Sequence, residues 1–258
     1  LCLYMSEVKP QDIVAVIRSW SNNQGVRMAV ERALQATRMG LVIVVVKDDD
    51  FAHQGAVARA LASIQDPRLV VREFRWGWTW SHALNAALAE VITRIDVGKE
   101  SFRYLLPVSV EVLWEPAHLD QLVAAFEQDP GLFVAGTSFD GRYEGRSMPL
   151  GPTYEHPRNT YALYALSALR RVAGWSPACD AMGGMEDAMA LIVAETLGFN
   201  WKQLDLKVPL VLGKNWDQAQ KQKREEAAIR EIGAYLNAVA ALAPTRYAEF
   251  CRRIGMTP

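Results

Sequence analysis

The sequence has few cysteines, and their spacing indicates no structural role. Its 258 residues include three, Cys2, Cys179 and Cys251, which are odd in number and far apart. Disulfide frameworks use an even set of cysteines, and structural zinc sites use closely spaced pairs. The sequence therefore argues against both, and we expect a protein of the reducing cytoplasm.

Long apolar runs and net charge are also missing. The most apolar run, residues 41–46, has the length of a strand and falls far short of the roughly 18 apolar residues that span a bilayer. The start LCLYM is too short for a signal peptide, so we expect no secretion signal and at most peripheral membrane contact. A formal net charge of −1 at pH 7 provides no field that attracts nucleic acid, and we expect no such partner.

The chain does have enough apolar residues, 50% of the total, to fill the core of one large domain. Strand and helix patterns alternate along its first half, which predicts an α/β fold with a mostly parallel central sheet flanked by helices. Ligands of such sheets bind at the carboxyl ends of the strands. The expected strands are residues 12–20, 41–46, 69–74 and 104–112, and the expected helices are residues 25–37, 55–64 and 81–95, with Gly40 capping the first.

The second half is organised differently. Residues 136–160 are dense in glycine and proline and have no period, which predicts a long irregular loop or short hairpin of the kind that often carries function. After it we expect a helix at residues 161–172, a strand at about 204–212 and a C-terminal helix at about 216–242.

Acidic residues mark two places where function is expected. Asp48, Asp49 and Asp50 follow a buried strand, where carboxylates can accept hydrogen bonds from a nucleobase or from ribose hydroxyls; the alternative is a solvated acidic turn. Glu186 and Asp187 follow paired glycines and open a helix, whose dipole favours their charge. Such a carboxylate can act as a general base, or it can serve only as a helix cap.

Aromatic residues form a third group. Trp76, Trp78 and Trp80 alternate, so an extended backbone would place all three on one side. They could stack on sugars or bases in a cleft, and a hydrophobic patch that holds the sheet to the second half explains them equally well. His82 follows them as a lone histidine, which is more often structural than catalytic.

Taken in order, these motifs resemble those of family-2-like glycosyltransferases of the GT-A fold, over residues 12–213. The family's acidic strand end corresponds to VVVKDDD, its A-x-N segment to WSHALNAAL, and its Gly-Gly and Glu-Asp stretch to MGGMEDAMALIVAETLG. The resemblance implies a nucleotide-diphospho-sugar transferase fold with an added C-terminal helix. It divides a single domain into a nucleotide-binding half (12–115), an acceptor and catalytic half (116–213) and a helical extension (214–258).

The resemblance also implies an activity and a set of site residues. The enzyme would be an inverting glycosyltransferase that uses a nucleotide sugar, with UDP- or GDP-sugars as the expected donors; Asp187 would be the base, with Glu186 beside it, and Asp48 would contact the nucleobase. The sequence does not indicate the acceptor or the oligomeric state. The expected donor-binding residues are Arg18, Ser19, Lys47, Asp48, Asp49, Trp80, Asn85, Ser109, Glu111 and Lys214, and the expected acceptor-binding residues are Trp78, His82, Gly183 and Gly184.

One family motif is missing. Where the family carries the metal-binding D-x-D, the stretch YLLPVSVEV has Val108 and Val110, and no histidine follows His156 to act as the family's late metal ligand. A departing diphosphate needs positive charge from a metal or from Lys and Arg. We therefore predict no metal ligand and a metal-independent reaction, with Lys214 stabilising the leaving group. A shifted Mg²⁺ or Mn²⁺ site that uses Glu111 is the alternative.

Two other functions stay open. The missing acids favour a degenerate GT-A domain that serves as a binding or assembly module, although a dead enzyme has no need for the acidic pair of MED. A related sugar nucleotidyltransferase is the third candidate. That class usually carries a glycine-rich phosphate loop with a basic residue after its first strand, and RSWSNNQG is a poor version of such a loop.

Overall fold

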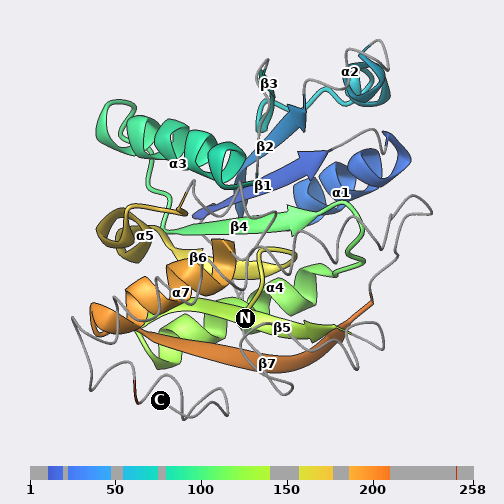
Figure 1. Ribbon diagram of the computed structural model, residues 1–258. Coiled ribbons are helices and arrows are strands. Elements are labelled where there is room, and N and C mark those ends of the chain that lie inside the picture. Colours follow the sequence, from blue (N-terminus) through green and yellow to red (C-terminus); the bar gives the residue numbers. More distant parts are fainter. Residues whose placement is uncertain are drawn as a thin grey trace, which may run out of the picture.

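The computed structural model describes residues 11–19, 23–47, 55–74, 80–139, 157–176, 186–209 and 248. Within them, seven strands form one sheet in the order β3-β2-β1-β4-β6-β5-β7, and helices cover both of its faces (Figure 1). The pairs β2–β3, β1–β2, β1–β4 and β5–β7 are parallel, whereas β6 runs antiparallel to both β4 and β5. The predicted α/β fold with a mostly parallel sheet is therefore confirmed.

The elements alternate as expected through the first half of the chain. The strands are β1 (Ile13–Ser19), β2 (Met39–Lys47), β3 (Leu69–Phe74), β4 (Tyr104–Ser109), β5 (Leu132–Phe139), β6 (Ala162–Ala165) and β7 (Asn200–Val208). The helices are α1 (Asn23–Gln35), α2 (Ala56–Leu61), α3 (Trp80–Asp96), α4 (Pro116–Gln128), α5 (Leu166–Val172) and α7 (Glu186–Thr196).

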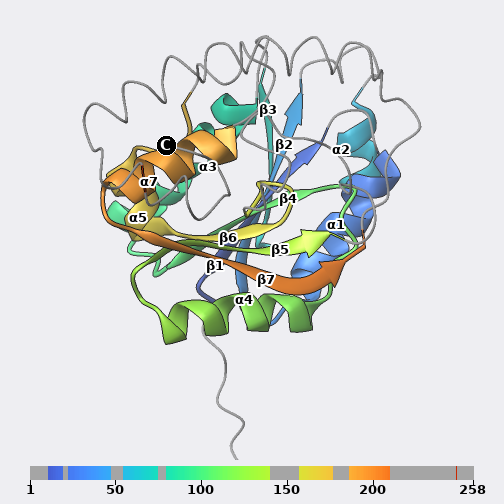
Figure 2. The same cartoon turned by 60° about the horizontal axis from the view of Figure 1, so that its bottom comes forward.

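The core lies on both faces of the sheet, which is why the central strands lack a polar side. In β1, Ile13, Ala15 and Ile17 pack with α1, α2 and α4, while Val14 and Val16 pack on the opposite face with α3, α5 and α7 (Figure 2). Successive strand residues point to opposite faces, so a strand covered on both sides must be apolar throughout. All seven residues of β1 are buried, including Arg18 and Ser19 at its carboxyl end.

The predicted role of Gly40 is wrong. This residue lies inside β2, after α1 has ended, and does not cap the helix. A Cβ atom at this position would collide with the carbonyl oxygen of Gln11 and come within 2.8 Å of the Phe102 ring. The glycine is therefore explained by the close approach of two backbone segments, a use of glycine that has no signal in local sequence.

The second half departs from the prediction in several places. Residues 161–172 do not form one helix, because residues 162–165 pair as β6 before α5 begins. Residues 136–139 belong to β5 rather than to a loop, and α4 and most of β5 were not expected at all. Strand β7 begins at Asn200, four residues before the expected start near 204. The predicted C-terminal helix lies outside the described residues.

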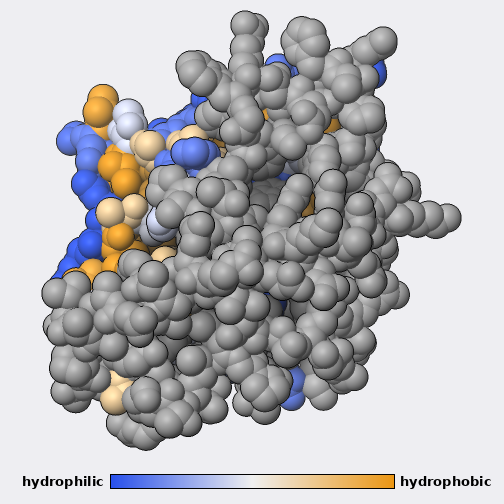
Figure 3. Space-filling view, in the orientation of Figure 1, coloured by the Kyte–Doolittle hydropathy of each residue, from blue (hydrophilic) through white to orange (hydrophobic). Residues whose placement is uncertain are grey.

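No helix in the described ranges is both long and apolar enough to cross a bilayer. Where these residues reach the surface in Figure 3, hydrophilic and hydrophobic ones are interspersed.

Candidate active site

The carboxyl ends of β1 and β4 and the first turn of α7 meet at one place. Arg18 is the penultimate residue of β1, and its partner across the parallel pair is Ser109, the last residue of β4. The guanidinium of Arg18 lies 3.5 Å from Glu186 Oε1, at the start of α7. The fold therefore joins three expected site residues that are widely separated in the sequence.

Arg18 and Glu186 form a buried ion pair. Their side chains are only 7% and 9% exposed. Burial lowers the pKa of Arg18 and the charge of Glu186 opposes the shift, but an arginine stays protonated in proteins at neutral pH. Removing two charges from water is costly, and the cost is offset only when further hydrogen bonds satisfy both groups.

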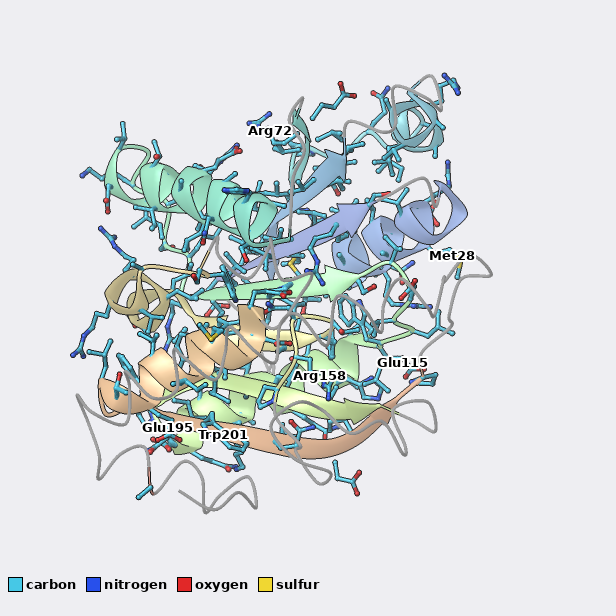
Figure 4. The ribbon with its side chains drawn as sticks, viewed as in Figure 1. Met28, Arg72, Glu115, Arg158, Glu195 and Trp201 are labelled. Carbon is cyan, nitrogen blue, oxygen red and sulfur yellow. The ribbon has the colours of Figure 1, made fainter. Side chains whose placement is uncertain are left out.

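Those hydrogen bonds come from Asn159, a residue that the sequence did not indicate. Its Nδ2 donates to Glu186 Oε1 at 3.3 Å, and its carbonyl oxygen accepts from Arg18 Nη2 at 3.4 Å. Its backbone N–H donates to Asp187 Oδ2 at 3.3 Å. It lies in a turn with Arg158, which Figure 4 places near the middle of the molecule. A lone asparagine in a segment expected to be a loop carries no local signal of this role.

The two adjacent acids differ in their surroundings. Glu186 is buried against Arg18, whereas Asp187 is half-buried at the same helix end. Burial raises the pKa of Glu186, the negative charge of Asp187 raises it further, and Arg18 and Asn159 partly oppose the rise. Of the two carboxylates, Asp187 is therefore the one that can reach a substrate, and Glu186 belongs to the supporting network.

Tyr164 and Trp175 extend the network formed by Arg18, Glu186 and Asn159. The Tyr164 hydroxyl donates to Asn159 Oδ1 at 2.8 Å, and its ring meets the Trp175 ring edge-on at a centroid distance of 5.3 Å. Burial raises the pKa of Tyr164 well above its usual range, and the charges of Asp187 and Glu186 act in the same direction. Tyr164 therefore keeps its proton and acts as a hydrogen-bond donor.

Asn85 was expected to bind the donor, and its side chain is held by the backbone of Trp175. Asn85 Nδ2 donates to the Trp175 carbonyl at 2.6 Å, and the Trp175 N–H donates to Asn85 Oδ1 at 2.9 Å. The preceding Gly174 has a φ of 76°, and a Cβ atom there would collide with Asn85 Oδ1. Asn85 thus fixes the backbone of the Trp175 segment, and its contact with a donor stays a prediction.

The other residues expected to bind the donor or the acceptor lie partly on described elements and partly outside the described ranges. Ser19 is buried at the end of β1, and Ser109 Oγ accepts from the Glu111 N–H at 3.5 Å in the turn after β4. His82 is exposed on α3. For Lys47 and Trp80 only the backbone is described, at the end of β2 and the start of α3. Six expected site residues lie outside the described ranges: Asp48, Asp49, Trp78, Gly183, Gly184 and Lys214.

The end of β4 and the turn that follows it carry apolar side chains at the positions where the family's D-x-D motif is expected. Val108 is buried in the apolar cluster that includes residues of α1, α2 and α4, and the partly buried Val110 packs against that cluster. Glu111 is the acidic side chain nearest in sequence, and one carboxylate alone does not supply the several oxygen ligands that Mg²⁺ or Mn²⁺ requires. Across the described ranges, no three His, Cys, Asp or Glu side chains gather where they could hold a metal.

Comparison with known proteins identifies the class of the fold and then the family. The structure resembles the mannosyltransferase PcManGT from Pyrobaculum calidifontis in complex with GDP-Man and Mn²⁺, with a TM-score of 0.68 and 14% identity over 94% of this chain and 70% of that one. It also resembles glucosyl-3-phosphoglycerate synthase from Mycobacterium tuberculosis in complex with Mn²⁺, UDP and phosphoglyceric acid, with a TM-score of 0.57 and 12% identity over 84% and 75% of the two chains.

These similarities confirm the predicted GT-A-like fold. The profile of glycosyl transferase family 2 matches residues 14–182, and the chain belongs to this family. The predicted glycosyltransferase activity is thereby confirmed at the level of the family, whose enzymes use nucleotide sugars. A comparison with curated proteins found no match.

The raised pKa of Glu186 predicts how stability depends on pH. The folded protein holds this proton over a range in which the unfolded chain, with an ordinary value of 4.5, has released it. The contribution of this group to the free energy of unfolding is therefore fully present below pH 4.5. It is lost as pH rises through the pKa of Glu186 in the folded protein. We expect the difference in unfolding free energy between the wild type and Glu186→Gln to decrease with rising pH.

Urea unfolding of both proteins in steps between about pH 4 and 8 measures this difference. Arg18 stays charged and Tyr164 stays neutral throughout, and the charge of Asp187 also acts on Glu186. A difference that grows with pH would show that attraction to Arg18 outweighs burial.

Proposed function

We propose that this enzyme transfers a sugar from a nucleotide-activated donor to a hydroxyl group of its acceptor with inversion, and that Asp187 is the general base. The observation that carries the assignment is the position of Asp187. It is the half-buried member of an acidic pair in the first turn of α7, beside the carboxyl end of β1, and a hydrogen bond from the Asn159 N–H orients it. Ligands of open α/β sheets bind beside such strand ends.

The proposed reaction is a single displacement. The acceptor oxygen forms a bond to the anomeric carbon as the bond from that carbon to the diphosphate oxygen breaks. The acceptor proton passes to Asp187, and the bonding electrons leave with the nucleoside diphosphate. Because attack and departure occur on opposite faces of the anomeric carbon, its configuration inverts.

The departing diphosphate carries negative charge that must be balanced. We assign this role to cationic side chains, with Lys214 as the first candidate, and propose a metal-independent reaction. The support is the apolar packing of Val108 and Val110 where the family's D-x-D motif is expected, and the lack of a metal-ligand group among the described side chains. UDP- or GDP-sugars are the proposed donors, because the similar structures hold UDP or GDP-Man.

A thermal-shift titration with UDP-, GDP-, dTDP- and CMP-sugars, each in EDTA and in Mn²⁺, tests this proposal. A ligand at 100 times its Kd adds about 2.7 kcal/mol to the free energy of unfolding, which moves the midpoint by several degrees. We expect one nucleotide to give such a shift in EDTA, and Lys214→Ala to lower turnover with that donor. A shift that requires Mn²⁺ would contradict metal independence and direct attention to Glu111.

The apolar packing of Val108 and Val110 also favours a second candidate, a domain that binds but does not catalyse. The same titration separates the two. A catalytic domain binds a donor and consumes it when acceptors are supplied, whereas a binding module without a donor site shows no shift with any nucleotide sugar.

A further inference from the structure

Asn159 forms hydrogen bonds with both acids of the candidate site, with Arg18 and with Tyr164. It is 1% exposed, and each of its four polar groups makes a hydrogen bond. The backbone N–H donates to Asp187, the side-chain NH₂ donates to Glu186, the backbone carbonyl accepts from Arg18, and the side-chain oxygen accepts from Tyr164. The base, its neighbour, the buried cation and the tyrosine all meet at this one residue.

Asn159 bonds the two acids through different groups, its backbone N–H and its side-chain NH₂, and helix geometry explains why. At 3.6 residues per turn, adjacent side chains on a helix point about 100° apart. Glu186 and Asp187 are adjacent, so a single amide group cannot reach both. Asn159 reaches Asp187 through its backbone and Glu186 through its side chain, which fixes the two carboxylates relative to each other.

The turn that contains Asn159 is itself anchored to the sheet. The carbonyl of its neighbour Thr160 accepts from the Ser109 N–H at 2.9 Å, at the end of β4. Tyr161 then pairs with Val108 in an isolated antiparallel bridge. Residues 158–160 therefore connect the carboxyl end of β4 with the N-terminus of α7, and a shift of the turn would move the base relative to the strand end.

We propose that Asn159 is the positioning residue of the catalytic acids, holding Asp187 in one orientation and keeping Glu186 against Arg18. The proposal rests on the function proposed above, in which Asp187 is the base. A leucine of similar volume would fill the same space and keep the two backbone bonds, but it would have no side-chain group for Glu186 or Tyr164. The asparagine side chain adds the bonds to Glu186 and Tyr164, which fix the turn whose backbone N–H holds Asp187. A base that is misplaced by about 1 Å can lose up to 100-fold in rate.

Asn159→Ala tests the role directly. It removes the bonds to Glu186 and Tyr164 while leaving a backbone N–H for Asp187. We expect kcat to fall by about 10- to 100-fold with the KM for the donor unchanged. Asn200→Ala is the matched control, because Asn200 Nδ2 also donates to a carboxylate, Asp129 Oδ2 at 3.2 Å, but at an exposed site. It should leave kcat unchanged.

A second readout does not depend on activity. The bond from Asn159 lowers the pKa of Glu186, so in Asn159→Ala the ¹³C titration of the Glu186 carboxyl should move to higher pH. Should the wild type transfer no sugar to any acceptor tested, the proposed function fails, and this titration still decides whether Asn159 governs the acids.

Tyr164→Phe covers the case in which Asn159→Ala does not fold. It removes only the hydroxyl that holds Asn159 Oδ1, and a smaller fall in kcat with the same upward titration shift would support the proposal. Folded variants at both positions with wild-type kcat and an unmoved Glu186 titration would overturn it, because a residue that only stabilises the fold would lower the unfolding free energy and nothing else.

Discussion

Asp187→Asn is expected to lower kcat by about 10²–10⁴-fold, the usual contribution of a general base. Asparagine has nearly the same shape as aspartate, and its side-chain oxygen can still accept the Asn159 N–H that Asp187 Oδ2 accepts at 3.3 Å. The substitution therefore removes the proton acceptor and leaves the geometry of the turn. Steady-state rates with the donor that gives the thermal shift provide the measurement.

A binding measurement and a control variant show whether the fall in kcat comes from loss of the base. The thermal shift with the donor should be unchanged in Asp187→Asn, since the base is assigned to the acceptor's proton and not to the nucleotide. Asp129→Asn is the control, because Asp129 is a carboxylate that accepts from the Gly131 N–H and from Asn200 Nδ2 at an exposed site. If Asp187→Asn kept full kcat, the base would have to be sought outside the first turn of α7.

Arg18→Met is expected to lower the free energy of unfolding by about 3–5 kcal/mol at pH 7, the cost of leaving one member of a buried ion pair without its partner. Glu186 would keep the bond from Asn159 but lose the guanidinium that lies 3.5 Å from its Oε1. Methionine retains the apolar length of the arginine side chain, so little of the loss should come from packing. Urea unfolding gives the value.

The matching control is Arg72→Met at the edge of the sheet (Figure 4). Arg72 pairs with Glu90 at 2.8 Å, a shorter contact than that of Arg18, but its side chain is 47% exposed. Exposed pairs contribute about 0–1 kcal/mol, so this variant should lose far less.

The double variant Arg18→Met and Glu186→Gln should recover most of the unfolding free energy that Arg18→Met loses, because no buried charge is left unpaired. Equal losses for Arg18→Met and Arg72→Met would contradict the buried pair.

The first half of the fold could be predicted because its strands carry a strong local signal. Residues 41–46 are apolar without interruption and rich in β-branched side chains, which is typical of a strand covered on both faces, and β2 occupies them. Strand β6 could not be predicted. Its four residues are too few to show a period, and it exists because β4 and β5 pair with it from either side, a cause that lies outside its own sequence.

The same distinction applies to the candidate site. Glu186 and Asp187 were predicted because an acidic pair at a helix start is a local pattern, and the structure places them in the first turn of α7. Asn159 and Tyr164 were missed because their roles depend on contacts across the fold. Asn159 reaches Glu186 over 27 residues of sequence, and no spacing rule connects them. Sequence therefore indicates which groups could react, and the fold determines which groups hold them.

The antiparallel pairing of β5 and β6 has a consequence for engineering. Gly136 lies opposite Ala162 and Val134 opposite Tyr164, so the carboxyl end of β5 and the amino end of β6 lie side by side at the same end of the two strands. The two attachment points of residues 140–156 are thus set by the ladder and not by the segment between them. Loop-closure entropy changes by only about 0.6 kcal/mol for each doubling of length. Segments of other lengths, taken from other members of the family, can therefore be grafted between Phe139 and Pro157 without redesigning the sheet.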